Sequence, residues 1–405
     1  MRLIIPEDKR APVLGKNEKA CCGCGACASI CPTKCIAMEK NMEGFSYPYI
    51  RIDECIHCHK CKSVCPILKT KDDKAIPIQS WAAISTDKEI QRSSSSGGIF
   101  TLLAEDILNE GGCIYGATFT DDFQQVYHTR IDDINDLYVL RTSKYLQSRT
   151  EGVFEDVEAQ LKTGRAVLFS GTPCQIAGLK AFLRAEYCNL ISVAIICHGV
   201  PSPKLWEKYI EQISRKYRGT ISSVNFRNKK YGWKKYGLQI KYKGKEYYRK
   251  LAVDPYMQMF LRNICLRESC YLCNAKDNGP EADITIGDFW GVETIVPEMN
   301  NIMGTSLVLL HSEKGRKLFE KREAFMKCKQ VDFDEAIKQN TSYFCSVKRP
   351  ESRNWFYKDL EELPWKKFVN KYGRLSFRKR IKKTVVKLYK YSHMFICDRK
   401  SRRKI

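Results

Sequence analysis

The sequence has no apolar run that approaches the ~18 residues a helix needs to cross a bilayer, so no membrane-spanning segment is expected. It also shows no apolar leader, because its first residues, 1–10, are charged. The 20 cysteines are therefore expected to be reduced thiols of a cytoplasmic protein, not disulfides of a secreted one. Acidic residues are scarce at the end, where the last forty positions hold sixteen Lys or Arg and one acid, Asp398. These absences disfavour an integral membrane protein and a disulfide-built scaffold.

Eight of the cysteines repeat one pattern, C-x2-C-x2-C-x3-C-P, which starts at Cys21 and again at Cys55. In this pattern three thiolates surround one 4Fe–4S cluster, and the cysteine before the proline reaches across to the other. A zinc module also uses C-x2-C pairs, but it needs neither the third cysteine nor the repeated Cys-Pro. We therefore expect two clusters: cluster I, held by Cys21, Cys24, Cys27 and Cys65, and cluster II, held by Cys55, Cys58, Cys61 and Cys31.

Four other residues of this stretch fall outside the ligand register. Cys22 and Cys35 are interpreted as small buried fillers. His57 and His59 are interpreted as solvated loop residues, with tuning of a cluster as the alternative.

A chain of 405 residues is too long for one small core, so two or three domains are expected. After a polar, proline-marked linker, strand and helix patterns alternate in the manner of an α/β domain. They predict strands at 81–85, 112–119, 166–170, 190–196 and 283–286, and helices at 98–109, 153–162, 176–184 and 204–214. Such sheets gather their ligands at the carboxyl ends of their strands.

A serine–glycine run, Ser93–Gly98, directly precedes a predicted helix. Hydroxyl groups at a helix start can cap it, and bare amides there can bind an anion. The candidate binding residues are Ser94, Ser95, Ser96, Gly97 and Gly98. A flexible linker is the alternative interpretation.

Four further cysteines lie on turns near glycines: Cys174, Cys197, Cys270 and Cys273. The first two end predicted strands, and the last two form a C-x2-C pair. Thr172 suits the N-cap of the following helix, which places Cys174 in its first turn. A third 4Fe–4S cluster is favoured, and a tetrahedral zinc site or separate buried thiols are the alternatives.

The order of several short motifs resembles the coenzyme F-420 hydrogenase/dehydrogenase beta-subunit family over residues 81–311. The matching segments are Arg92–Gly98, Ser143–Tyr145, Ser170–Gln175, Cys197–Pro201 and Gly287–Gly291. The resemblance implies FAD, an additional iron–sulfur cluster, and hydride exchange with an 8-hydroxy-5-deazaflavin. It also implies that Lys144 meets a flavin phosphate or the reduced ring, and that Thr172 and Asp288 lie at the cofactor. For Lys144 the alternative is an ordinary surface lysine. For Asp288 the alternative is a helix or turn cap. No G-x-G-x-x-G fingerprint is present, so FAD rests on the resemblance.

The expected fold is a bacterial two-cluster ferredoxin domain, a mixed α/β domain that binds flavin and a cluster, and a basic helical tail. The expected boundaries are 1–70 for the ferredoxin domain, 71–80 for the linker, 81–165 and 166–340 for the two parts of the beta-subunit domain, and 341–405 for the tail.

The expected function is an oxidoreductase that passes electrons between its clusters and a hydride carrier through FAD. Its partner is a redox protein or a small hydride carrier. An electron-transfer adaptor, or a reductase component of surface-polysaccharide synthesis without F-420, is the alternative. Nucleic-acid binding is disfavoured because the positive charge is concentrated in the tail.

The tail carries its own pattern. In a helical register, Phe377, Ile381, Val385 and Leu388 form one apolar stripe among many cations. This pattern predicts a helix that lies on an anionic membrane, at its inner face. A helix docked on its own domain through the same stripe is the alternative.

Overall fold

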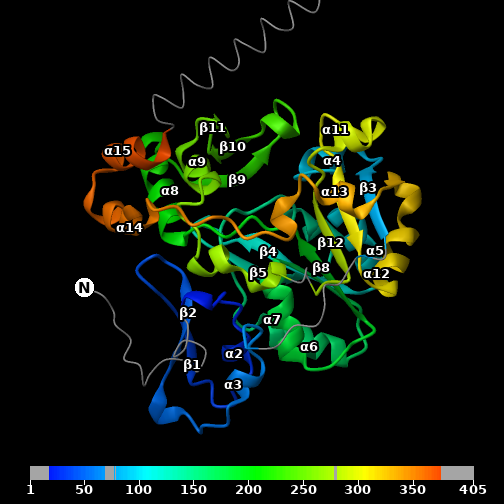
Figure 1. Cartoon of the computed structure of the whole chain (residues 1–405), viewed down its shortest axis with the longest axis horizontal. Coiled ribbons are helices and arrows are strands. Elements are labelled where there is room, and N and C mark those ends of the chain that lie inside the picture. Colours follow the sequence, from blue (N-terminus) through cyan, green and yellow to red (C-terminus); the bar gives the residue numbers. More distant parts are fainter. Residues whose placement is uncertain (1–17, 69–76, 78, 278–280, 375–405) are drawn as a thin grey trace, which may run out of the picture.

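The computed structural model describes residues 18–68, 77, 79–277 and 281–374 (Figure 1). A small N-terminal module lies against one end of a larger α/β body. Within the described residues, no helix has the length and apolar character that crossing a membrane requires.

The N-terminal module, residues 18–68, has little regular structure. Two strands pair antiparallel, and two single-turn helices contain the third cysteine of each triplet, Cys27 and Cys61. The elements are β1 (Ile36–Lys40), β2 (Ser46–Ile50), α2 (Ala26–Ser29) and α3 (Lys60–Ser63). Its core joins Phe45, which is fully buried, to Tyr47 and to the thiols of Cys31 and Cys35. So small a core is typical of a fold that depends on bound metal.

The body is built on a nine-stranded mixed sheet in the order β14-β3-β13-β12-β8-β7-β4-β5-β6. Strands β4, β7, β8 and β12 run parallel to one another, and β3, β13 and β14 pair antiparallel to their neighbours. Strand β5 pairs antiparallel to β4 and parallel to β6. The strands are β3 (Gln79–Ser85), β4 (Cys113–Phe119), β5 (Val126–Ile131), β6 (Ser148–Arg149), β7 (Val167–Gly171), β8 (Leu190–Ile195), β12 (Ile284–Asp288), β13 (Ser306–Leu310) and β14 (Met326–Gln330).

Helices cover both faces of this sheet, which explains its continuous apolar strands. Leu168 points to the face packed by α5 and α12, whereas its neighbours Val167 and Phe169 point to the face packed by α6 and α7. The helices of this body are α4 (Lys88–Ser93), α5 (Ile99–Asn109), α6 (Val153–Lys162), α7 (Pro173–Leu183), α10 (Asn274–Asp277), α11 (Val292–Ile295), α12 (Glu313–Lys321) and α13 (Phe333–Ile337).

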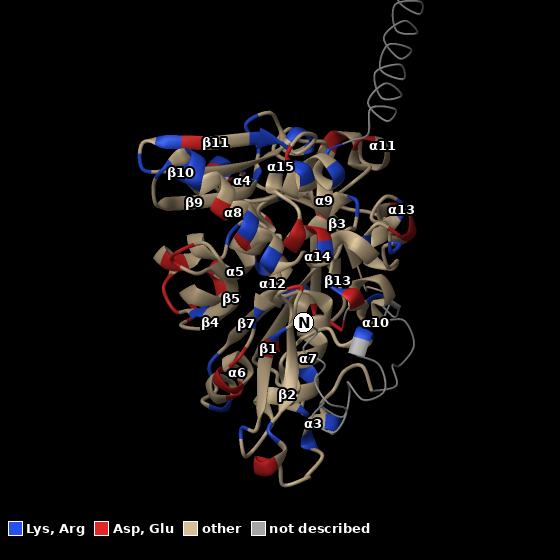
Figure 2. Ribbon diagram, turned by 90° about the vertical axis from the view of Figure 1, so that its left-hand side faces the viewer, with Lys and Arg blue, Asp and Glu red and all other residues tan. Residues whose placement is uncertain are grey.

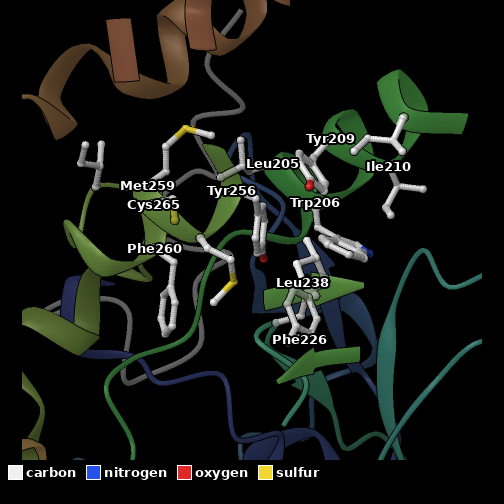
Figure 3. Close-up of a cluster of buried hydrophobic side chains, with 14 of the residues drawn as sticks. Leu205, Trp206, Tyr209, Ile210, Phe226, Leu238, Tyr256, Met259, Phe260 and Cys265 are labelled. Atoms are coloured by element: carbon white, nitrogen blue, oxygen red, sulfur yellow. The ribbon is translucent and has the colours of Figure 1, made fainter. Parts of the chain in front are cut away.

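A second layer is a three-stranded antiparallel sheet, β9 (Ile221–Asn228), β10 (Gly237–Tyr242) and β11 (Lys245–Lys250), in the order β11-β10-β9. It packs on α8 (Pro203–Tyr217) and α9 (Pro255–Leu261). Figure 3 shows Trp206 and Tyr209 of α8 beside Tyr256 of α9 and Phe226 of β9, in a core rich in aromatic rings. The outer edge, β11 and its turn, is largely basic (Figure 2).

All nine elements predicted in the α/β region are present, with boundaries shifted by up to three residues. Thr172 is the N-cap of α7 and Pro173 its first residue, as predicted, with Gln175 completing a capping box. The largest difference lies in the range 341–405. Residues up to 374 pack into the second layer, because α14 (Arg353–Glu362) and α15 (Trp365–Phe368) bury Phe356, Leu360 and Phe368 there. The predicted stripe at 377–388 lies outside the described residues.

Candidate functional site

The four cysteines predicted to hold cluster II surround one space. A cavity of about 170 Å³ is lined by Cys31, Cys55, Cys58 and Cys61 together with apolar residues such as Ile50. Burial raises the pKa of Cys61, and the nearby Cys31, Cys55 and Cys58 thiols raise it further. Cys58 is exposed, so this edge of the module faces solvent.

The cysteines predicted to hold cluster I lie deeper. Cys21, Cys24 and Cys65 are buried. Burial raises the pKa of Cys27, and the nearby Cys21 and Cys65 thiols raise it further. Cys65, from the second repeat, therefore lies near Cys21 and Cys27 of the first triplet, with Cys61 also near, and the crossed ligand pattern stays a prediction. Gly23 and Gly25 adopt φ +68° and +80°, a left-handed backbone that favours glycine.

A second, much larger cavity of about 610 Å³ lies where this module meets the body. Its wall contains ten of the predicted site residues: Ser95, Ser96, Gly98, Lys144, Thr172, Cys174, Cys197, Cys270, Cys273 and Asp288. Ser94 and Gly97 are outside this wall. Its volume falls within the range of about 300–1,000 Å³ common for cofactor sites.

The four thiols of this large cavity come from three separate elements. Cys174 opens α7, Cys197 follows β8, and Cys270 and Cys273 belong to a 3-10 turn, Glu268–Leu272, and the residue after it. Burial raises the pKa of Cys197 to about 12, and neighbouring thiols contribute. Buried thiols stay protonated unless a positive group supplies compensating charge, and metal ligation does so.

These thiols do not meet at one point. In the part of the chain that the structure describes, no three His, Cys, Asp or Glu side chains converge in the way a single metal ion requires. A tetrahedral zinc site holds its sulfurs about 2.3 Å from the metal, and both the 4Fe–4S cluster and the zinc site stay predictions for these four thiols.

Cys22 is partly buried against an apolar cluster, as a filler would be, and it also lines the large cavity beside Cys174. The neighbouring Cys22 thiol and burial raise the pKa of Cys174. Cys35 is buried as predicted, and its Sγ lies 3.5 Å from Sγ of Cys31.

The serine–glycine run forms a tightly held turn before α5. The Ser95 hydroxyl lies 2.9 Å from Oγ of Ser143 and accepts a hydrogen bond from the Ser143 amide at 2.8 Å. The Ser96 hydroxyl donates to the carbonyl of Thr305 at 2.8 Å. Gly98, at φ +90°, is the N-cap of α5 and makes no side-chain cap. Gly98, Ile99 and Phe100 at the start of α5 line the cavity, and the N-terminus of a helix suits an anionic group.

Gly97 has a different role from the one predicted. A Cβ at this position would lie 2.4 Å from the carbonyl oxygen of Ala83 in β3. Its amide donates to Oγ of Ser306 at 3.0 Å. Gly97 therefore packs the turn against the sheet.

Two cations, Arg227 of β9 and Lys229 of the turn after it, bind backbone carbonyls of the serine–glycine run. Lys229 donates to the carbonyls of Ser96 at 3.1 Å, Gln91 at 2.5 Å and Met303 at 2.6 Å. The Arg227 guanidinium lies 2.7 Å from Asp288 at the end of β12 and 3.3 Å from the Ser95 carbonyl. Sequence reasoning missed both residues, because they sit in a run of basic residues without a motif of their own.

Lys144 lines the same cavity rather than the outer surface. Its amine donates to the carbonyls of Val139 at 2.8 Å and Arg141 at 2.7 Å. Burial lowers the pKa of Lys144 to about 7. The protonated ammonium form has three donors, so in that form one remains for a ligand, whereas the two donors of the neutral amine are both used by these carbonyls.

The ferredoxin module docks on the body beside this cavity. The Thr150 hydroxyl donates to the Cys24 carbonyl at 2.8 Å, and the Gln147 amide donates to the Cys22 carbonyl at 3.0 Å. Gly178 of α7 meets Cys24 directly. The two halves of the molecule are thus joined at the cluster I cysteines.

Comparison with protein families matches two regions of the chain. Residues 20–67 match the 4Fe–4S dicluster domain. Residues 164–335 match the C-terminal region of the beta subunit of coenzyme F420 hydrogenase/dehydrogenase.

Individual relatives match less of the chain. An uncharacterised polyferredoxin-like protein of Methanocaldococcus jannaschii is 34% identical over 58 residues, which are 12% of this chain and 34% of that protein. The chain therefore spans about a third of that curated relative. A chain in the xenon-derivatised F420-reducing [NiFe] hydrogenase complex from Methanosarcina barkeri aligns with 68% of this chain and 90% of its own length, at 18% identity and a TM-score of 0.45. The two matched regions are thus similar to a 4Fe–4S dicluster domain and, separately, to the C-terminal region of the coenzyme F420 hydrogenase/dehydrogenase beta subunit.

Proposed function

We propose that the chain passes electrons between its dicluster module and a two-electron hydride carrier, by means of an FAD and a third 4Fe–4S cluster held in the large cavity. One observation supports this most strongly: a single cavity contains the four thiols, the serine–glycine turn, Lys144 and Asp288, and its wall includes Cys22 of the ferredoxin module. A carrier of the F-420 type is the substrate class that the family suggests.

Cys174, Cys197, Cys270 and Cys273 would hold the third cluster. The Thr172 hydroxyl lies 3.2 Å from Sγ of Cys174, and the Val200 amide donates to Sγ of Cys270 at 3.5 Å. Hydrogen bonds of this kind to ligand sulfurs favour the reduced state of a cluster.

The serine–glycine turn would hold a flavin at the other side of the cavity. The amides at the start of α5 suit its phosphates, since helix N-termini attract anions. Lys144 would donate a hydrogen bond to the cofactor, and Arg227 fixes Asp288 and the Ser95 carbonyl. A bound flavin converts between the single electrons of clusters and the electron pair of a hydride.

We infer that electrons leave the cavity from Cys174 towards Cys22, a neighbour that raises its pKa and lies in sequence between the cluster I ligands Cys21 and Cys24. Cluster II lies beyond, and its exposed Cys58 marks the edge where a redox partner protein would exchange electrons.

The test is anaerobic purification of the full chain, followed by determination of flavin and iron per chain and a visible spectrum. We expect one flavin per chain, bleached by a hydride donor before cluster absorption falls. Cluster absorption without flavin, in protein refolded or supplied with FAD, would contradict this proposal and favour a simple electron-transfer adaptor.

A further inference from the structure

Arg267 is a fully buried cation at the junction of the ferredoxin module and the large cavity, with no exposed surface. Its Nε donates to the Cys21 carbonyl at 2.8 Å, and one terminal nitrogen donates to the Ser46 carbonyl at 3.0 Å. The other terminal nitrogen donates to Oε1 of Gln147 at 2.9 Å. These bonds fix the guanidinium between the two parts of the molecule.

The same guanidinium approaches a predicted cluster ligand. Its Nη2 donates to Sγ of Cys21 at 3.8 Å, a distance suited to a sulfur acceptor. The ring of Tyr47 covers it at 4.0 Å. Gly23 admits it, because a Cβ there would lie 2.9 Å from the guanidinium carbon. The loop that carries the first cysteine triplet thus contacts the Arg267 guanidinium at both Cys21 and Gly23.

The charge of Arg267 is paired with no acidic side chain of the described residues. Among residues 18–68, 77, 79–277 and 281–374, no Asp or Glu lies within ion-pair distance of it. Arg353, a second buried arginine at this junction, instead pairs with Glu43 at 2.6 Å and with Glu268 at 3.2 Å. A buried charge is costly unless it is compensated. A 4Fe–4S cluster with its four thiolates is anionic and becomes more so when reduced.

We propose that Arg267 is the counter-ion of cluster I and raises its reduction potential, so that electrons leaving the cavity settle on the cluster beside it. A nearby positive charge and a hydrogen bond to a ligand sulfur both favour the more negative, reduced state. This inference rests on the assignment of Cys21 to cluster I in the proposed function.

The test is a redox titration followed by electron paramagnetic resonance, made on the full anaerobic chain. We expect Arg267→Met to shift the midpoint of one ferredoxin cluster to lower potential and to leave the other clusters unchanged. Arg267→Lys keeps the charge but loses the fork of donors, so its shift should be smaller. Arg353→Lys is the matched control, and its midpoints should equal those of the wild type.

Three outcomes separate the possibilities. If Arg267→Met keeps its iron and every wild-type midpoint, Arg267 only docks the module and the inference is wrong. If Arg267→Met loses its iron, Arg267→Gln decides, because it also removes the charge but keeps a hydrogen-bond donor, and a wild-type midpoint in that variant overturns the inference. Cys21→Ala checks the underlying assignment: full iron content there would refute Cys21 as a ligand, whereas a loss of about four irons would leave only the role of Arg267 in question.

Discussion

Gly178 of α7 lies against Cys24 of the first cysteine triplet, so closely that a Cβ on Gly178 would stand 2.7 Å from Cβ and 2.9 Å from Sγ of Cys24. The absence of a side chain at one position of a helix therefore lets a cluster ligand approach the helix that carries Cys174.

Gly178→Ala should weaken this junction although alanine normally favours a helix. Overpacking of this kind costs about 1–3 kcal/mol, which should appear as a lower urea midpoint under anaerobic conditions. Gly219→Ala is the control, because a Cβ there meets only Cβ of Tyr242 at 3.8 Å. Equal urea midpoints for Gly178→Ala and the wild type would mean that the junction accommodates the added methyl group without a loss of free energy of unfolding.

If the third cluster exists, replacing its proposed cysteine ligands should remove a defined number of irons. The anaerobic wild type should contain about twelve irons, and the double variant Cys174→Ala/Cys197→Ala about eight, with the ferredoxin signals intact. Replacing Cys188 and Cys328, which lie outside the cavity wall, should leave the content at about twelve irons. An unchanged iron content in the first variant would refute the site, and zinc near one per chain would favour the tetrahedral alternative.

The serine–glycine turn is tested better at Ser95 than at Gly97, where any side chain meets β3. Ser95→Ala removes the hydroxyl that holds Ser143 and should weaken flavin retention about fivefold, the effect of roughly 1 kcal/mol. Ser93→Ala is the matched control, since the Ser93 hydroxyl donates to the Glu89 carbonyl in its own helix at 2.7 Å. Equal flavin content in both variants and the wild type would mean that the turn does not hold the cofactor.

The buried His128 predicts a loss of stability in mild acid. Burial lowers its pKa from 6.5 to about 4, and its ring nitrogens contact Oγ of Ser148 at 2.6 Å and the carbonyl of Ser170 at 2.9 Å. Because the folded pKa is depressed, the unfolded chain binds the proton more readily. Stability is therefore complete above the unfolded pKa and falls as pH drops from 6.5 towards 4.

The shift of His128 corresponds to about 3 kcal/mol over that window. Urea midpoints measured across it should fall less steeply for His128→Gln than for the wild type. Parallel pH profiles would show that other groups determine the acid sensitivity.

The basic tail predicts membrane association that depends on lipid charge. A truncated chain should end after Arg374, because Phe368 and Tyr372 are buried in the body. The full chain should sediment with anionic vesicles, more weakly at high salt, and the truncated chain should not. If both remain in the supernatant at low salt, the tail does not bind membranes.

The sequence predicted the parts of the site whose geometry is local. A ferredoxin repeat specifies eight ligands by spacing alone, and the capping residues Thr172 and Pro173 place Cys174 at a helix start. Cys270 and Cys273 were recognisable as a pair, but only the tertiary fold brings them to Cys174.

Single arginines and lysines carry no such signal. Arg267 has no neighbouring motif, and its contacts with Cys21 span 246 positions. Lys229 lies in a basic run that also contains the exposed Lys230, and only the structure shows its three carbonyl partners. Burial, rather than residue type, distinguishes these cations, and burial is set by the whole fold.

The pairing of Arg353 with Glu43 has a consequence for synthesis of the protein. These residues are 310 positions apart, so the partner of Glu43 leaves the ribosome long after the ferredoxin module. Domains generally fold in the order in which they emerge. The module therefore spends most of translation without its final contacts, which gives iron–sulfur assembly factors access to cysteines that the completed fold encloses.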